Sequence, residues 1–393
     1  MTEAIYFDNA CTTYPKPEEV AQAVYAYITQ VGSNVNRSSY GRAYGAEEMV
    51  YDARERLCRF FGGSDCRNAV FTKNVTESLN ILLKGFLKPG DHVITTSMEH
   101  NAVMRPLTQL SRQGVAFSRA WCREDGSLPP GALEKCLRPN TRALVMTHAS
   151  NVCGTILPVE EAGAFCRAHG LRFFVDAAQT GGTVPIHMQE MHIDALAFTG
   201  HKGLLGPQGI GGFILGEDMP MELEPLLSGG TGSVSHKEEM PDFMPDRFEA
   251  GTLNLPGIAG LCAGLDWLEK TGIHRIARHE LDLTEQFLAG LNGLKARGLG
   301  IEILGKMGRE GRTGVVSIRT PGHGLAQTAA RLDEAYGIMT RVGLHCAPYA
   351  HRTLGTFPEG TIRFSFGWWN RAEQVEAAVE ALGRILAEES DGF

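Results

Sequence analysis

The chain has 393 residues, which is more than a single hydrophobic core usually holds, so two domains are expected. Its composition, 43% hydrophobic and 21% charged, is that of a globular protein, and its net charge of −8 argues against a nucleic-acid-binding protein. The sequence has no apolar run of membrane-spanning length and no signal peptide, and its nine scattered cysteines favour a reduced, cytoplasmic protein over a disulfide scaffold.

Short apolar runs alternate with helical patterns from about residue 45 to residue 255. The runs expected to form strands are 68–72, 91–97, 142–148, 171–177, 195–200 and 211–215. Between them, helices are expected over 76–87 and 159–170. Nearly continuous apolar strands that alternate with helices are typical of a mostly parallel sheet with both faces covered.

The pattern changes after Pro256 and Gly257, which are expected to mark a boundary. The helices expected beyond it cover 257–271, 275–297, 324–336 and a last segment from about 370. The strands expected there cover 301–304, 314–320 and 361–367. This order predicts a smaller α+β unit, so the fold class is α/β with a second, smaller domain.

Polar residues follow several of the predicted strands, at the edge where parallel sheets bind ligands. Thr76 lies at a helix start behind Asn74 and Glu77, whose spacing indicates a capping box, and such a start with a hydroxyl suits a phosphate. His100 and Asn151 follow two further strands. Taken singly, each has a structural alternative as a helix cap or a turn residue.

Asp176 and Lys202 give the sharpest local signals. Asp176 ends a strongly apolar strand, where a carboxylate is costly unless it has a partner such as a protonated pyridine; a helix cap is the alternative. Lys202 lies between His201 and a glycine-rich turn, where partial desolvation lowers the amine pKa and makes a carbonyl nucleophile; a solvated surface lysine is the alternative. The spacings of nucleotide-binding glycine loops are absent from this turn.

Together these strand ends supply what pyridoxal phosphate needs: a phosphate anchor, a histidine to stack on the ring, a carboxylate and a lysine. The chain also resembles the class V aminotransferase family of fold-type I pyridoxal-phosphate enzymes, in its cysteine desulfurase and selenocysteine lyase branch. The motifs that carry the resemblance are YFDNACTTYPKP, TESLN, MEHN, HASNVCGT, VDAAQ, TGHKGLLGPQGIG, FEAGTLN, RVGLHCAP and IRFSF. It implies a large cofactor-binding domain over residues 16–255, and a small domain from residues 1–15 and 256–393.

The resemblance also implies which residues bind the cofactor, with Lys202 forming the Schiff base and moving a proton at the substrate α-carbon. Asp176 would hold the pyridine nitrogen protonated, Gln179 would contact the ring hydroxyl, and His100, counted as catalytic with Lys202, would stack on the ring. Thr252 would reach the phosphate of a neighbouring subunit, which implies a homodimer. The full cofactor-binding set is Thr76, His100, Asp176, Gln179, Thr199, His201, Lys202 and Thr252.

For the substrate, the resemblance implies that Arg363 holds the carboxylate, with Asn151 and Arg341 assisting. Cys346 matches the sulfur-accepting cysteine, and its context, R-V-G-L-H-C-A, is similar to the group that reads R-x-G-H-H-C-A. Leu344 replaces the first histidine of that pattern. We expect the remaining His345, and His351, to help ionise the thiol.

The expected function is a cysteine desulfurase that takes sulfur from L-cysteine as a persulfide on Cys346 and releases L-alanine, with an acceptor protein that removes the sulfur. An alternative is a selenocysteine lyase or another C–S lyase in which Cys346 is not obligatory. A non-enzymatic alternative is a scaffold that holds zinc on His345, Cys346 and His351, although a structural zinc takes four ligands.

Overall fold

The structure is a computed structural model that describes residues 4–35 and 40–388. Its centre is a sheet whose seven strands occur in the order β2-β8-β7-β6-β5-β3-β4. Their bounds are Ala69–Thr72, Gly211–Leu215, Ala195–Thr199, Arg172–Asp176, Thr141–Thr147, His92–Thr96 and Ala116–Ala120. Only β8 runs antiparallel to its neighbours in this sheet, so the other strands end at one common edge.

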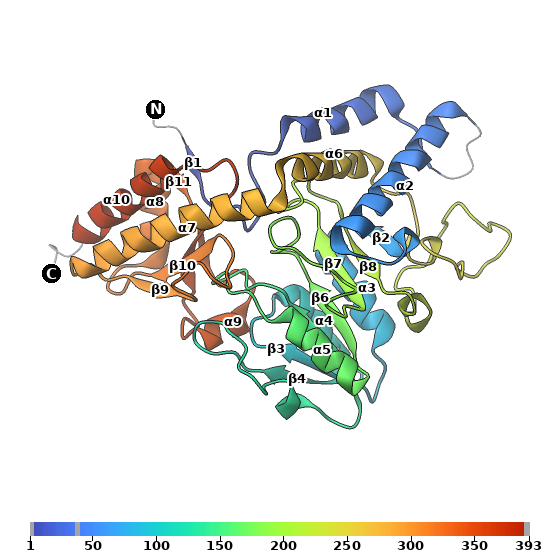
Figure 1. Ribbon diagram of the computed structural model, residues 1–393, viewed down its shortest axis with the longest axis horizontal. Helices are drawn as coiled ribbons and strands as arrows, with labels where there is room; N and C mark the ends of the chain where they lie inside the picture. Colours follow the sequence, from blue (N-terminus) through green and yellow to red (C-terminus); the bar gives the residue numbers. More distant parts are fainter. Residues whose placement is uncertain (1–3, 36–39, 389–393) are drawn as a thin grey trace.

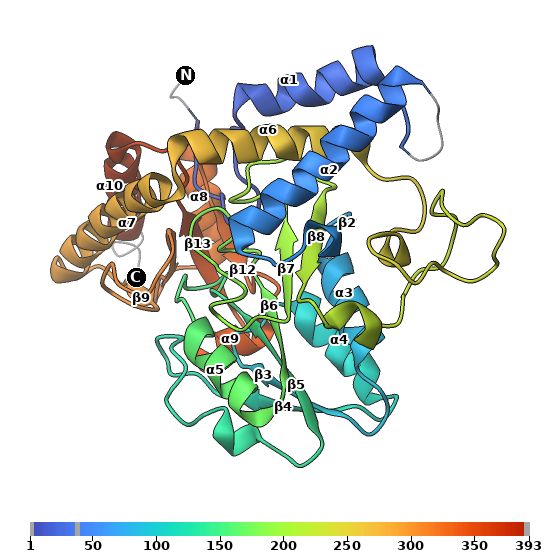
Figure 2. The same cartoon turned by 45° about the vertical axis from the view of Figure 1, so that its right-hand side comes forward.

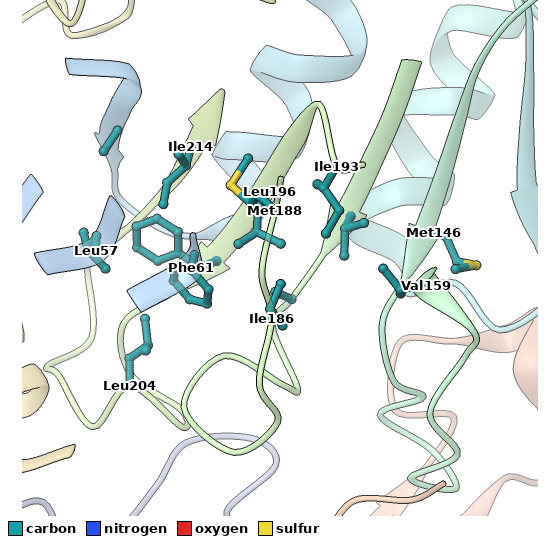
Figure 3. Packing of buried hydrophobic residues seen from close by; sticks show 14 of the residues in the cluster. Leu57, Phe61, Met146, Val159, Ile186, Met188, Ile193, Leu196, Leu204 and Ile214 are labelled. Atoms are coloured by element: carbon teal, nitrogen blue, oxygen red, sulfur yellow. The ribbon is translucent and has the colours of Figure 1, made fainter. Parts of the chain in front are cut away.

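Helices cover both faces of this sheet. Side chains alternate along its buried strands, so each strand contributes apolar residues to both faces. In β5, Leu144 and Met146 join one core cluster, while Ala143 and Val145 join the other. The first cluster includes residues of α2 (Gly41–Phe61), α5 (Val159–His169) and α6 (Leu255–Thr271), and the second those of α3 (Val75–Phe86) and α4 (Asn101–Ser111). Figure 3 shows part of the first cluster, where Phe61 lies close to Leu57 and Ile214.

A second, antiparallel sheet has the order β12-β13-β10-β9, with bounds Arg341–Gly343, Thr361–Ser365, Val315–Arg319 and Glu302–Leu304. Its helices are α7 (Ile273–Ala296), α8 (Leu325–Tyr336) and α10 (Ala372–Glu388), which contribute to a third core cluster. Figures 1 and 2 show these elements gathered on one side of the large sheet.

The ends of the chain connect the two parts. Strand β1 (Ile5–Tyr6) pairs in parallel with β11 (Ile338–Met339), and α1 (Glu18–Ala26) packs along α6. Helix α9 (Pro348–Thr353) follows the Cys346 loop and lies near β3 in both views (Figures 1 and 2). Shorter turns of 3-10 or π type cover Tyr27–Val31, Cys66–Asn68, Glu134–Cys136, Met219–Glu222 and Asp246–Phe248.

The expected fold class is confirmed, and the predicted strands match observed ones to within one or two residues at each end. Strand β4 was not predicted, because its sequence AFSRA carries polar residues and is only half-buried at the sheet edge. The domain boundaries stay a prediction: Pro256 lies in the first turn of α6, which packs with the large sheet. Across residues 4–35 and 40–388, no helix combines the length and hydrophobicity needed to cross a membrane.

Candidate active site

Lys202 lies in a tight turn after β7, at the edge where the parallel strands end. Gly203 allows this turn to pack closely, because a Cβ atom there would lie 2.3 Å from the carbonyl oxygen of Gly181. Burial, aided by the positive charge of Arg363, lowers the pKa of Lys202 to about 8, while Asp176 opposes the shift. A larger share of the amine is therefore neutral and nucleophilic near neutral pH than in a solvated lysine.

Asp176 is the last residue of β6, the strand next to β7. Its side chain is 3% exposed and accepts a hydrogen bond of 2.9 Å from the backbone N–H of Ala178. Burial raises the pKa of Asp176, and the positive charge of Lys202 opposes the rise. A cation placed against this carboxylate would offset the cost of burying its charge.

His100 caps the start of α4, after β3. Its Nδ1 accepts a hydrogen bond of 3.0 Å from the backbone N–H of Ala102. Burial, followed by the charge of Lys202, lowers the pKa of His100 to about 4, so the ring is neutral at pH 7. A neutral imidazole that accepts at Nδ1 carries its proton on Nε2, which fixes the tautomer.

Thr199 and His201 flank the same turn as Lys202. The Oγ1 atom of Thr199 and the Nδ1 atom of His201 are buried and have no hydrogen-bond partner within the described part of the chain. Burial, with smaller effects from Lys202 and Lys16, lowers the pKa of His201 to about 4. The backbone carbonyl of His201 is held by Thr12, Thr13 and Lys16, whose Nζ lies at 2.5 Å.

Arg363, in β13, is 2% exposed and lies opposite Arg341 of β12 in the small sheet. Its Nη2 forms an ion pair of 2.7 Å with Asp8, its Nη1 donates to the carbonyl of Asn151 at 3.0 Å, and its Nε has no partner among the described residues. Arg341 donates to the Sγ of Cys11 at 2.8 Å. The guanidinium of Arg363 is thus held rigidly while retaining donors for a carboxylate.

Cys346 is exposed, and the backbone carbonyls of its loop are bound by the start of α4 and by the turn after β5. The N–H of Asn101, the residue after His100, donates to the carbonyl of Cys346 at 2.7 Å. The side chain of Asn151 donates to the carbonyl of His345, also at 2.7 Å. His345 and Cys346 have φ angles of 47° and 57°, a region that residues other than glycine rarely adopt and that is found at functional loops.

The comparisons with known proteins agree with this geometry. The sequence pattern described as aminotransferase class-V matches residues 5–378. The chain belongs to this family. A probable cysteine desulfurase of Methanothermobacter thermautotrophicus is 34% identical over 98% of this chain and 95% of its own length, and a cysteine desulfurase of Haloferax volcanii is 32% identical over 97% and 89%. The apo structure of a cysteine desulfurase from Thermococcus onnurineus NA1 superposes with a TM-score of 0.91 at 33% identity, covering 98% of this chain and 95% of that one.

Membership of the class V aminotransferase family implies pyridoxal phosphate as cofactor, and the residues present fit it. Thr199 and His201 offer unpaired buried polar atoms to a phosphate group. Asp176 offers a carboxylate in need of a cation, and Lys202 an amine of lowered pKa for an aldehyde. The hydrogen bond from Ala102 reaches the Nδ1 atom at the edge of the His100 ring. It does not occupy the faces of the ring, which stacking on a cofactor ring would use.

Two further predicted cofactor residues, Gln179 and Thr76, lie in a loop and at a helix start. Gln179 donates from Nε2 to the carbonyl of Ala10 at 3.0 Å, and it lines a small cavity of about 40 Å³ together with Lys202. Thr76 is the second residue of α3, where Asn74 accepts from the N–H of Glu77 at 3.0 Å, as the predicted capping box requires. The Glu77 carboxylate reaches back to the N–H of Lys73, one residue before the cap.

Thr252 lies apart from this group, exposed on the approach to α6. It lines a hollow of about 400 Å³ together with Tyr51, Arg54 and Glu249 rather than with Lys202. The Arg54–Glu249 ion pair fixes one wall of this hollow at 2.6 Å. The expectation that Thr252 serves a partner subunit stays a prediction.

The expectation that His345 and His351 help to ionise the thiol stays a prediction. Burial lowers the pKa of His345 to about 2 and that of His351 to about 4, so neither ring carries charge near pH 7. Each instead contacts a threonine hydroxyl, Thr361 at 2.9 Å and Thr356 at 2.7 Å. The zinc alternative gains no support either, since no three potential ligands gather for a metal within residues 4–35 and 40–388.

Sequence reasoning missed Asp8, Cys11 and Glu99, all of which lie at or behind the site. Asp8 follows a very short strand, and Cys11 lies in the loop beyond it, where no local pattern marks either residue. Glu99 offered a signal that was available: a carboxylate in the turn TTSMEHN, directly after an apolar strand. The strand-end argument that identified Asp176 applies to it equally.

Proposed function

We propose that the protein is a pyridoxal-phosphate-dependent cysteine desulfurase that transfers the sulfur of L-cysteine to Cys346 and releases L-alanine. The observation that carries the proposal is the position of an exposed Cys346, whose carbonyl is bound by the residue next to His100. Lys202, Asp176 and Arg363 supply the remaining functions. The relatives that cover almost the whole chain carry the same activity in their names.

Each residue of the site has a defined task in this chemistry. The cofactor, when bound, supplies an electron sink that weakens bonds at the substrate α- and β-carbons. Arg363 binds the substrate carboxylate through its free donors, and Asp176 keeps a negative charge where the ring nitrogen must stay protonated. Lys202 removes the α-proton as general base.

The sulfur transfer is a displacement at the substrate sulfur. The thiolate of Cys346 attacks that sulfur, an S–S bond forms, and the carbon–sulfur bond breaks with its electron pair left on the carbon skeleton. Protonation of the β-carbon and return of the α-proton by Lys202 then give L-alanine, and Cys346 holds a persulfide. The positions of Cys346 on a backbone-anchored loop and of Arg363 on rigid β13 support a fixed approach of the two groups.

The proposal extends to the assembly and its partners. We infer a homodimer in which Thr252 reaches the cofactor phosphate of the other subunit, and a protein that accepts sulfur from Cys346. The exposed position of Thr252, beside a hollow that Lys202 does not line, supports the dimer. All nine cysteines are free thiols, which fits the proposed reduced, cytoplasmic setting.

A comparison of substrates tests the function. Purified enzyme with pyridoxal phosphate is incubated with L-cysteine or L-selenocysteine, with and without reductant, and alanine is measured for wild type and C346A. The proposal predicts that C346A loses turnover of L-cysteine. Unchanged turnover of L-cysteine by C346A would instead favour the selenocysteine or C–S lyase alternative, in which the thiol is not obligatory.

A further inference from the structure

Glu99 is a completely buried carboxyl group to which the proposed mechanism gives no task. It lies in the turn between β3 and α4, directly before His100. The backbone N–H of Thr147 donates to both of its oxygens, at 3.1 and 2.9 Å, and Thr96 Oγ1 contacts Oε1 at 2.5 Å. The carboxyl group therefore fastens the turn that carries His100 to β5.

This link lies next to the carboxylate proposed to face the cofactor. Thr147 and Asp176 are paired residues of the neighbouring strands β5 and β6. Burial raises the pKa of Glu99 to about 8, and the negative charge of Asp176 adds to the rise, while the bonds from Thr96 and Thr147 oppose it. Two buried carboxyl groups this close do not both ionise readily, so one of them retains a proton.

Two further titratable groups near Glu99, Cys122 and His100, carry no charge near pH 7. Cys122, which follows β4, has its pKa raised to about 12 by burial, and His100 on the same turn is neutral. The positive charge of Lys202 interacts with Asp176 and favours ionisation there. The proton of the pair therefore belongs to Glu99 and the charge to Asp176.

We propose that Glu99 is a positioning residue that acts as a neutral carboxylic acid, holding the His100 turn against the strand beside Asp176 without adding a second negative charge there. The hydrogen bond between Thr96 and Glu99 can form whether the carboxyl group is protonated or ionised, because a hydroxyl group can both donate and accept. Loss of the proton would place a second negative charge beside Asp176. The effect expected of Glu99 on turnover rests on the proposed function.

Infrared spectroscopy tests the protonation state without any assay of activity. The difference spectrum of wild type minus E99Q, at about pH 6, should contain the carbonyl band of a protonated carboxylic acid, and at about pH 10 the bands of a carboxylate. Carboxylate bands already present at about pH 6 would overturn the proposal. E217Q, at an exposed glutamate, is the control and should show carboxylate bands at both pH values.

Turnover tests the positioning role. We expect turnover of L-cysteine by wild type to decline above about pH 8. E99Q should retain turnover at about pH 7 within roughly threefold and should lose this decline. Coinciding pH profiles of wild type, E99Q and E217Q would overturn the role. If E99Q does not fold, E280Q removes a partly exposed glutamate whose pKa is also raised to about 8, and the protonated-acid band of Glu99 should remain in its spectrum at about pH 6.

Discussion

At the scale of single residues, the site depends on polar groups that burial leaves incompletely paired. Arg363 is held by Asp8 and by the carbonyl of Asn151, yet its Nε lacks a partner within the described ranges. Lys202 is a cation whose burial opposes its charge. A ligand that supplies the missing hydrogen-bond partner, or that reacts with the buried amine, is therefore bound favourably. Such incompletely paired groups are usual at binding sites.

R363K should raise the KM for L-cysteine by about 10- to 100-fold with a smaller change in kcat, because lysine keeps the positive charge but lacks the planar fork that binds a carboxylate. Steady-state kinetics of alanine release measure the effect. R319K, in β10 of the same sheet and with exposed partners, should leave KM unchanged. An unchanged KM in R363K would remove Arg363 from substrate binding.

The lowered pKa of Lys202 gives a pH dependence for cofactor attachment. Only the neutral amine reacts with an aldehyde, and an amine is neutral above its pKa. The rate at which cofactor-free enzyme attaches pyridoxal phosphate should therefore rise with pH and level off above about 8, as followed by absorbance in stopped flow. A rate that keeps rising toward the pKa of a solvated lysine, about 10.4, would contradict this environment.

At the scale of elements, strand ends and helix starts bring the site together. The strand ends could be predicted because each apolar run stops at a polar residue, as at Asp176 and Thr199. The contact of Asp8 with Arg363 joins residues 355 positions apart, and no local pattern encodes it. For the same reason, neither the neutral state of His345 nor the fixed backbone of Cys346 could be deduced, since both depend on what packs around them.

The loop that carries Cys346 should loosen when its side-chain anchor is removed. N151A deletes the bond to the carbonyl of His345, which helps to hold two residues at positive φ. We expect faster hydrogen exchange over residues 344–347 and slower turnover of L-cysteine. N140A, which loses a bond to Gly90 far from the loop, is the control. Unchanged exchange in N151A would mean that the loop is held by other contacts.

The start of α3 should depend on its cap. N74A removes the bond from the N–H of Glu77 and should lower the free energy of unfolding by about 1 kcal/mol, measured by urea denaturation. It should also weaken binding of pyridoxal phosphate, because Thr76 lies at this helix start. Loss of stability with unchanged cofactor affinity would separate the cap from the proposed phosphate site.

At the scale of the whole molecule, the small sheet and its helices lie on one side of the large sheet (Figures 1 and 2). Arg363 contacts Asn151, which follows β5, and the loop of Cys346 contacts Asn101 at the start of α4. The N-terminal segment contacts both parts of the molecule. Asp8 pairs with Arg363 of the small sheet, and the carbonyl of Ala10 accepts a hydrogen bond from Gln179, which follows β6 of the large sheet. The site is thus assembled from both ends and the middle of the chain. Cofactor and substrate groups therefore belong to one folded unit, and the dimer would add Thr252.

Y51E tests the proposed dimer. Tyr51 lines the hollow of Thr252 and is 53% exposed, and a charge there should disrupt an interface that buries it. Sedimentation should show a shift from dimer to monomer and a loss of cofactor retention. W121E, at an aromatic residue of the same 53% exposure near α9, should stay dimeric. A monomeric wild type would contradict the assembly and the role of Thr252.

The central claim is that the sulfur of L-cysteine moves to Cys346. Stoichiometric sulfur-labelled L-cysteine is added to the holoenzyme without reductant, the protein is alkylated, and the label is located by peptide mass spectrometry. The account predicts one labelled sulfur on Cys346 for each alanine released, and no labelled sulfur on Cys11, a thiol that interacts with Lys202. Release of alanine with the label free in solution, or on another cysteine, would contradict it.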